Sequence, residues 1–474
     1  MLENRRPPVN HETYEVGVDE LFFSTTDRKG VIEQANSVFV RISRYSWDDL
    51  IGAPHNIIRH PDMPGGAFLA LWSMLLDGQP SCAYVHNLAA DGTTYTVFAT
   101  MTPLADGFLS VRSRCSTALV GAANAIYDAV RPVEFLTREA GQSAHDAAVA
   151  GAREMQQRLS GEGFAGYPEF VKAALPAEVE ARAELSHGLP ERPDADGVYA
   201  DVLAAVHRMD DELKEFLAHM GELADTAAQL QSASDQAQAA SAEREAAAER
   251  IREAASTNAS FAPVLMPVNL WVSMSDEMKR ELAELTTTLA ELQASCTDTR
   301  FRLALARLHS DMLGQFAAEL IDEVPGHENA APAMGDLCEA IFDGMEQTET
   351  QMARNADLAT RAAAKINEAT GVLQLPLDLI EAWRVKAAER EDDVVRGLIP
   401  IVEEQVDRSI TAIAALRELA AKCAAIAEPM RTDAIDVECA RIRALVFPTP
   451  GRAFAEDDED DVAPVELTGP RRGM

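Results

Sequence analysis

The sequence predicts an α+β domain over residues 12–115, followed by a mostly α-helical bundle or coiled coil. Aromatic residues are concentrated at the front, with twelve of the 27 in the first 115 positions and no tyrosine after Tyr199. Short β-like runs alternate with short helical runs in the same stretch. Behind it, no proline occurs between Pro193 and Pro263, which permits one very long helix.

The first domain is expected to contain a five-stranded antiparallel sheet and several short helices. Asn36 and Ser46 stand where helix N-caps belong, before residues 37–43 and 47–50. Another helix is expected between Pro64 and Asp77-Gly78. Two β-like runs precede these helices and three follow them: 21–26, 31–33, 82–88, 94–103 and 108–114.

Residues 116–197 are predicted to connect the two parts. An amphipathic helix is expected over 118–130, and 133–157 has a weaker helical pattern. Glycine and proline are frequent over 158–197, which favours an irregular linker with a short helix inside it.

Residues 198–446 carry the periodicity of long packed helices. Apolar side chains recur at alternating spacings of four and three along the first helix, at Val202, Val206, Met209, Leu213, Phe216, Met220, Leu223, Ala227 and Leu230. Such a seam keeps one stripe of a helix against a partner helix. A disordered acidic tail is expected over 447–474, where positions 456–461 are all acidic.

The composition excludes several kinds of function. A formal net charge of −35 argues against nucleic acid and anionic membranes as partners. No apolar run approaches the roughly 18 residues of a membrane-spanning helix, and the N-terminus lacks the apolar core of a signal peptide. We therefore expect a cytoplasmic protein.

The sequence also lacks the patterns of metal sites and of common enzymes. Six scattered cysteines without a Cys-x-x-Cys pair indicate free thiols, so no metal site is predicted. Walker-type, Gly-x-Ser-x-Gly and His-Glu-x-x-His motifs are absent, so no enzymatic activity is expected.

One segment of the first domain carries a specific motif, Gly52-Ala53-Pro54-His55-Asn56-Ile57-Ile58-Arg59-His60-Pro61-Asp62-Met63-Pro64, followed by Ala67-Phe68 and Trp72. With Ala35-Asn36 before it and Gly78-Gln79-Pro80 after it, this segment resembles the sensory PAS domain of bacterial aerotaxis receptors. The resemblance covers residues 12–115.

The resemblance implies a sensor of redox state or oxygen with noncovalently bound FAD. Five positions match family residues that bind the flavin or form its pocket: Asn36, Arg59, His60, Asp62 and Trp72. A planar guanidinium such as that of Arg59 can pair with a diphosphate or a carboxylate. Arg59, His60 and Asp62 could equally form an ion-pair and capping network around a tight turn.

Three departures from the family pattern keep a cofactor-free alternative open. The family's tryptophan after Gly78-Gln79-Pro80 is Ser81, the usual basic stretch is Leu88-Ala89-Ala90-Asp91, and Thr96 replaces an aromatic residue. The sequence thus predicts a PAS signal-transduction protein whose helices contact protein partners and form a homodimer. The alternative is a PAS dimerisation scaffold without a cofactor.

Overall fold

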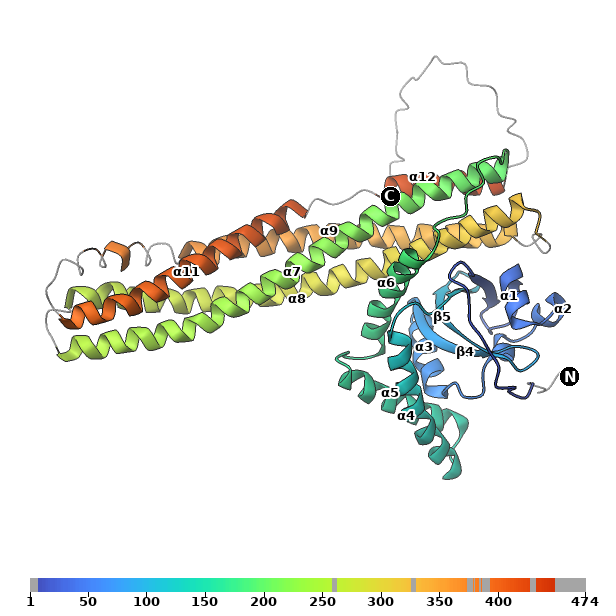
Figure 1. Ribbon diagram of the computed structural model, residues 1–474, viewed down its shortest axis with the longest axis horizontal. Coiled ribbons are helices and arrows are strands. Elements are labelled where there is room, and N and C mark those ends of the chain that lie inside the picture. The colour runs from blue at the N-terminus through green and yellow to red at the C-terminus, as the bar shows by residue number, and fades with distance from the viewer. Residues whose placement is uncertain are drawn as a thin grey trace, which may run out of the picture.

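The computed structural model describes residues 7–257, 262–324, 330–372, 378, 380–382, 385, 393–426 and 432–447. These residues form an α+β domain at one end of a long helical bundle (Figure 1). The predicted fold class is therefore confirmed. Most of the expected disordered tail, from residue 448 onward, lies outside the described residues.

The α+β domain is built on one sheet with short helices between its strands. Its elements are β1 (Thr13–Tyr14), β2 (Phe22–Asp27), β3 (Ile32–Ala35), α1 (Ser37–Ser43), α2 (Trp47–Leu50), the 3-10 helix η1 (His55–Ile58), α3 (Gly65–Leu76), β4 (Ser81–Leu88), β5 (Thr94–Pro103) and β6 (Gly107–Ser113). The five predicted strands pair antiparallel in the order β4–β5–β6–β2–β3. The two-residue strand β1, which the sequence did not indicate, pairs parallel with the start of β5.

Asn36 holds the junction between β3 and α1. Its side-chain oxygen accepts hydrogen bonds from the backbone N–H groups of Phe39 (3.1 Å) and Phe23 (3.0 Å), and its amide donates to the carbonyl of Leu21 (2.8 Å). The predicted N-cap is confirmed. The same side chain also ties α1 to strand β2.

Both faces of the sheet are covered. Successive side chains along a strand point to opposite faces, so each strand contributes to both. Asn87, Ala99 and Arg112 face an internal cavity on the side of η1 and α3. Their neighbours on the other face are covered by three helices from later in the chain, α4 (Leu119–Glu139), α6 (Tyr167–Leu185) and α8 (Ala262–Ile321).

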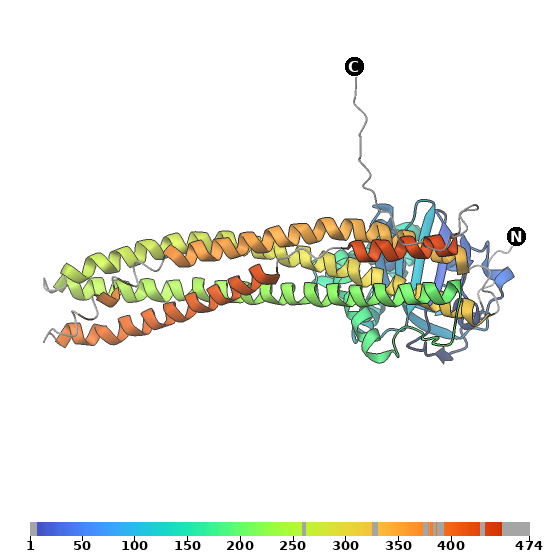
Figure 2. The same cartoon turned by 90° about the horizontal axis from the view of Figure 1, so that it is seen from above.

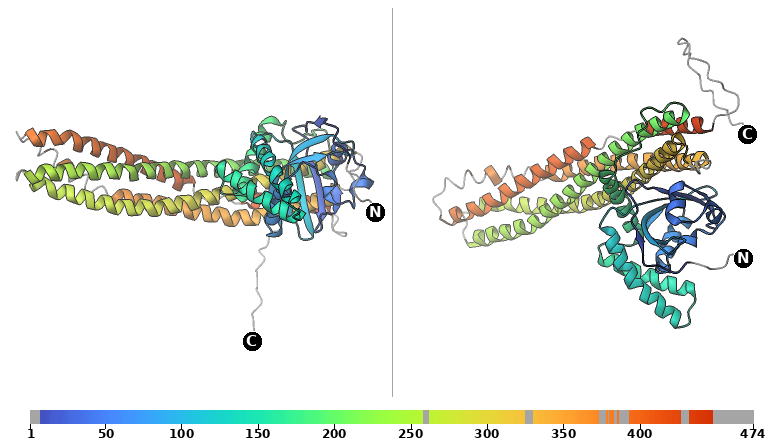
Figure 3. Two further views of the ribbon diagram at one scale, coloured as in Figure 1. Left: turned by 90° about the horizontal axis from the view of Figure 1, so that it is seen from below. Right: turned by 45° about the vertical axis from the view of Figure 1, so that its right-hand side comes forward.

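Along the chain, the domain and the bundle are connected by α4, α5 (Ala144–Gly161) and α6. Helices α4 and α5 pack against each other and project from the domain on the side away from the bundle (Figure 3). α5 crosses α3 closely at Gly66, where an added Cβ would lie 2.4 Å from the backbone nitrogen of Ala152. The sequence predicted a short helix inside an irregular linker over 158–197, and α6, with 19 residues, is longer than that prediction.

The bundle consists of α7 (Val198–Thr257), α8, α9 (Ala330–Val372) and α11 (Asp393–Ile426), with α12 (Asp433–Val446) against α7 and α9 (Figure 2). α7 packs on α8 and α11, and α9 packs on the same two helices, so four helices of one chain enclose a common core. The nine seam residues of α7 are at most 2% exposed. At 1.5 Å per residue, the 60 residues of α7 span about 90 Å.

Within the described residues, no helix combines the length and the apolar character that crossing a membrane requires.

Candidate functional site

A cavity of about 320 Å³ lies inside the α+β domain, between the inner face of the sheet and the segment that carries η1 and α3. The walls are largely apolar. They include Ile58, Phe68, Leu71 and Trp72 from the helical side and Val85, Ala99 and Met101 from the strands. Such an enclosure suits a flat organic ligand, because small-molecule sites are mostly apolar with a few placed polar groups.

The most unusual polar group in the cavity wall is Arg112 of β6, which is only 4% exposed. Its Nη2 lies 2.5 Å from Nε2 of His55, and its guanidinium lies 5.5 Å from the centroid of the Phe39 ring. Its Nη1 has no hydrogen-bond partner among the described residues. Burying a cation without a carboxylate partner costs free energy. A ligand that accepts hydrogen bonds or carries negative charge would therefore be stabilised in this cavity.

Burial and the neighbouring Arg112 charge both lower the pKa of His55 well below its usual value. Burial lowers the pKa of Arg112 to about 10, which still leaves it charged at neutral pH. The neutral imidazole therefore accepts a hydrogen bond from Arg112 at Nε2 and carries its own proton on Nδ1. This arrangement fixes the orientation of Arg112.

Two further polar atoms in the cavity wall lack partners among the described residues. These are Nδ2 of Asn87 on β4 and Oγ1 of Thr26 on β2. Together with Arg112 they provide donors from three strands on one face of the sheet. The residues present thus fit a ring system with acceptor atoms along one edge.

Two of the five residues predicted for the site, Arg59 and Trp72, line the cavity. The Arg59 guanidinium lies 4.1 Å from the centroid of the Phe68 ring and donates to the carbonyl of Met63 (2.9 Å). The Trp72 ring packs edge-on against Phe108, with centroids 5.0 Å apart. Arg59 follows η1 and Trp72 lies on α3, so both belong to the helical side of the wall.

The other three predicted residues lie outside this cavity, and their proposed roles in binding stay predictions. The groups of Asn36 are engaged at the start of α1. His60 is 6% exposed, and its Nδ1 accepts the backbone N–H of Asp62 (3.1 Å). The Asp62 side chain is 61% exposed and pairs with Arg131 of α4 at 3.3 Å.

Sequence reasoning did not assign a binding role to His55, Asn87 or Arg112. A signal for Arg112 was present, because it is a lone cation inside the otherwise apolar and small run Phe108–Ser113. Strict alternation places it on the same face as Phe108 and Ser110. The pairing with His55 could not be read from the sequence, since the two residues are 57 positions apart.

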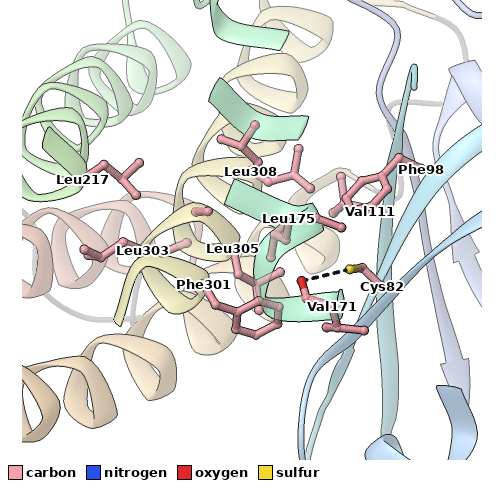
Figure 4. Close-up of a cluster of buried hydrophobic side chains, with 14 of the residues drawn as sticks. Cys82, Phe98, Val111, Val171, Leu175, Leu217, Phe301, Leu303, Leu305 and Leu308 are labelled. Carbon is pink, nitrogen blue, oxygen red and sulfur yellow. Dashed lines mark hydrogen bonds between the residues drawn. The ribbon is translucent and has the colours of Figure 1, made fainter. Parts of the chain in front are cut away.

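The outer face of the sheet joins the domain to the helical region. Figure 4 shows α6 lying between the sheet and α8, with Val171 and Leu175 of α6 reaching toward Cys82, Phe98 and Val111 of the strands. The Cys82 thiol donates to the carbonyl of Val171 (3.6 Å). α6 is therefore in contact with both the strands and helix α8 of the bundle.

A buried carboxylate anchors this contact. Glu178 of α6 is 2% exposed and accepts hydrogen bonds from the Tyr84 hydroxyl (2.7 Å) and from the backbone N–H groups of Ser116 (2.6 Å) and Thr117 (3.1 Å). The Thr117 hydroxyl donates to it as well (2.6 Å). One side chain thus links α6, strand β4 and the segment that leaves β6.

α8 also touches the sheet directly. The Phe316 ring packs edge-on against Phe23 of β2, with centroids 5.1 Å apart. His309, which is 1% exposed, lies 3.5 Å from the Thr102 hydroxyl of β5. The domain is therefore joined to the bundle over a broad buried surface.

The strand order and the cavity between sheet and helices define the first domain as a PAS domain. Its sequence resembles that of an aerotaxis receptor. The chain is 35% identical over 129 residues to the aerotaxis receptor of Escherichia coli (strain K12), a match that covers 26% of this chain and 26% of the receptor. The chain thus spans about a quarter of that relative's length.

The remaining comparisons, with protein-family models and with solved structures, add no assignment for this chain. No protein-family model matches it. A cysteine-to-valine variant of the fungal photoreceptor VVD matches with 19% identity over 23% of this chain and 86% of that one, at a TM-score of 0.18. A cysteine-to-serine mutant of Vivid matches with 17% identity over 24% of this chain and 92% of that one, also at 0.18.

Proposed function

We propose that this PAS signal transducer responds to redox state or oxygen by holding FAD in the cavity of its first domain. The observation that carries the proposal is the buried Arg112 in the cavity wall, whose Nη1 has no hydrogen-bond partner among the described residues. A bound flavin would supply reversible oxidation and reduction. The resemblance to aerotaxis receptors supports the same cofactor.

The cavity residues divide into two groups with different tasks. The apolar walls from α3 and the strands would enclose the ring faces and exclude water. Arg112 and Asn87 would donate hydrogen bonds to acceptor atoms on one ring edge. Because Arg112 is charged and held by His55, the domain attracts a ligand more strongly when the ligand gains negative charge. Ligand binding at this place therefore depends on the ligand's redox state.

The proposed signal leaves the domain through the sheet. Arg112 on the inner face is adjacent in sequence to Val111 on the outer face, and Val111 packs in the cluster with Leu175 of α6 (Figure 4). A shift of β6 would change the packing of α6 and α8. Such a route needs an element with two arrangements, and α6 packs against both the sheet and α8 of the bundle.

A cofactor-free scaffold is the second candidate, favoured by the three departures from the family pattern. None of them lines the cavity. Ser81 donates to the sulfur of Met74 (3.6 Å), and Thr96 pairs with His86 (2.8 Å) on the other face of the sheet. Leu88 is the last residue of β4, and residues 89–91 lie in the turn between β4 and β5. Their positions leave the proposed flavin contacts intact, so we favour the sensor.

The output is proposed to be contact of the helices with other proteins, not catalysis. We also propose action in the cytoplasm, because five of the six free cysteines are buried and reduced thiols suit that compartment. A homodimer remains part of the proposal. Its interface would have to lie outside the α7 seam, since α8, α9 and α11 of the same chain fill that core.

The visible spectrum of the purified full-length protein tests the flavin. We expect the absorption bands of an oxidised flavin, bleached by anaerobic dithionite, and release of FAD on denaturation. Replacing Arg112 by Gln should remove the charge and lower flavin content at least several-fold, since a charged hydrogen bond is worth about 1.5–3 kcal/mol.

Arg114→Gln is the matched control, because it removes the same charge two positions along from Arg112, outside the cavity wall. It should retain the wild-type flavin content. A colourless, folded wild-type protein that takes up no added flavin would refute the cofactor and leave the scaffold. Equal flavin content in the Arg112 and Arg114 variants would refute the role given to Arg112.

A further inference from the structure

A groove of about 710 Å³ lies on the outside of the PAS domain, between α3 and the α4–α5 pair. It shares three lining residues with the internal cavity: Arg59, Phe68 and Trp72. These side chains therefore form the partition between the two spaces. A ligand that passed this partition would have one end inside the domain and the other against α4 and α5.

The groove has an excess of positive charge in a chain with a net charge of −35. Arg59, Arg131 and Arg138 line it, against the carboxylates of Asp62 and Glu134. Both carboxylates already have partners. Glu134 accepts the backbone N–H groups at the start of α3, at 2.9 and 2.7 Å, and Asp62 pairs with Arg131 at 3.3 Å.

Arg138 is the cation best placed for a ligand. It is exposed near the end of α4, and its guanidinium donates to the backbone carbonyl of Gln142 (3.1 Å), a neutral partner. Arg131 lies two helical turns earlier, so both arginines face the groove. Guanidinium groups spaced along one helix suit a chain of phosphates.

The two spaces differ in what they can hold. The cavity is at the lower end of the volumes typical of small-molecule sites, whereas the groove is well within that range. The cavity is apolar with donors on one edge, and the groove is open and cationic. This division matches a ligand with a flat ring at one end and phosphates at the other.

We propose that the groove binds the phosphate-bearing part of the flavin nucleotide, with Arg138 and Arg131 of the α4–α5 pair as its cationic contacts. The proposal rests on the proposed flavin function and adds to it a second compartment outside the PAS sheet. It makes the connecting helices part of the cofactor site. The protein should therefore discriminate between flavins by their phosphates.

Binding of riboflavin, FMN and FAD to the full-length apoprotein, followed by quenching of flavin fluorescence, tests this proposal. We expect affinity to rise in that order and the difference to shrink as salt is added. Arg138→Gln should weaken FAD and FMN about ten-fold and leave riboflavin unchanged within about two-fold. Inorganic pyrophosphate should compete with FAD but not with riboflavin.

Arg153→Gln is the matched control, because it removes an exposed arginine of α5 that does not line the groove. It should bind all three flavins as the wild type does. The double variant Arg131→Gln/Arg138→Gln should abolish the preference for phosphates. Circular dichroism would verify that each variant is folded.

The outcomes separate the two proposals. Equal affinity of the wild-type protein for riboflavin and FAD, or equal loss of both in Arg138→Gln, would overturn the phosphate groove and leave the flavin cavity standing. If none of the three flavins bound to the wild-type protein, the cofactor proposal itself would fall, and the groove with it.

Discussion

His309 is a buried histidine at the contact between the PAS sheet and α8, and its environment makes the protein sensitive to acid. Its Nε2 lies 3.5 Å from the Thr102 hydroxyl, and its Nδ1 has no partner among the described residues. Burial lowers its pKa to about 3. The folded protein therefore keeps this ring neutral, whereas in the unfolded chain it protonates near pH 6.5.

Between pH 6.5 and 3 the unfolded state binds one more proton at His309 than the folded state, so stability is lost as the pH falls. The loss is about 1.4 kcal/mol per pH unit, or roughly 2 kcal/mol from pH 6.5 to 5. His309→Gln should therefore lose about 2 kcal/mol less than the wild type over that interval in urea unfolding.

The comparison of variants matters because other groups titrate nearby. Burial raises the pKa of Asp311 and of Glu319 on α8, and raised carboxylate pKa values favour the folded state at low pH. Subtracting the wild-type curve from that of the variant removes their contribution. His187→Gln, at a side chain 94% exposed, is the control and should follow the wild type. Parallel curves for His309→Gln and the wild type would contradict the assignment.

For single residues, the sequence could predict roles that depend on neighbouring positions, but not contacts between residues far apart in the chain. Asn36 was predicted as an N-cap from its neighbours alone, because the capping bond closes over three residues. The engagement of its amide with Leu21 depends on the packing of a separate strand. The pairing of Arg112 with His55 is of the same kind, and only the folded sheet brings them together.

At the scale of elements, α6 shows where pattern reasoning fails. Its glycine- and proline-rich surroundings suggested a linker, yet Pro168 falls in its first turn, where a missing N–H costs little. α6 is buried against both the sheet and the bundle, so its apolar residues do not form one stripe. The seam of α7 was predictable, because a single stripe against partner helices produces a strict heptad. The division of the chain into 12–115, 116–197 and 198–446 stays a prediction.

Glu178 offers a test of how firmly α6 is held. Glu178→Ala would leave the Tyr84 hydroxyl and two backbone N–H groups without their acceptor in a buried place. We expect a loss of about 3 kcal/mol or more in the free energy of unfolding, since each unsatisfied buried donor costs about 1–3 kcal/mol. Glu178→Gln keeps one acceptor oxygen and should lose less.

Glu180→Ala on the same helix is the control for Glu178. This residue pairs with Arg300 at 2.7 Å, but its side chain is 46% exposed, and such surface pairs contribute at most about 1 kcal/mol. Urea unfolding of the full chain measures all three variants. An equal effect of the two alanine substitutions would show that Glu178 does not anchor the contact.

On the scale of the whole molecule, the long helices close their core within one chain. The seam of α7 faces α8 and α11, and the leucines Leu282, Leu285, Leu289 and Leu292 of α8 are fully buried. The periodicity indicated that α7 has partner helices. Sequence alone could not distinguish partners in the same chain from partners in a second one, because both bury the same stripe.

The origin of these partner helices can be tested by unfolding the bundle at different protein concentrations. Leu289→Ala removes a fully buried side chain and should cost about 2–5 kcal/mol. If the core lies within one chain, the urea midpoints of the wild type and of this variant should both stay constant over roughly a hundred-fold range of concentration, because no association is coupled to the folding of that core. Thr287→Ala, at an exposed position two residues earlier on α8, should change stability by less than about 0.5 kcal/mol. Midpoints that rose together with concentration in both proteins would show that folding of the bundle is coupled to association between chains.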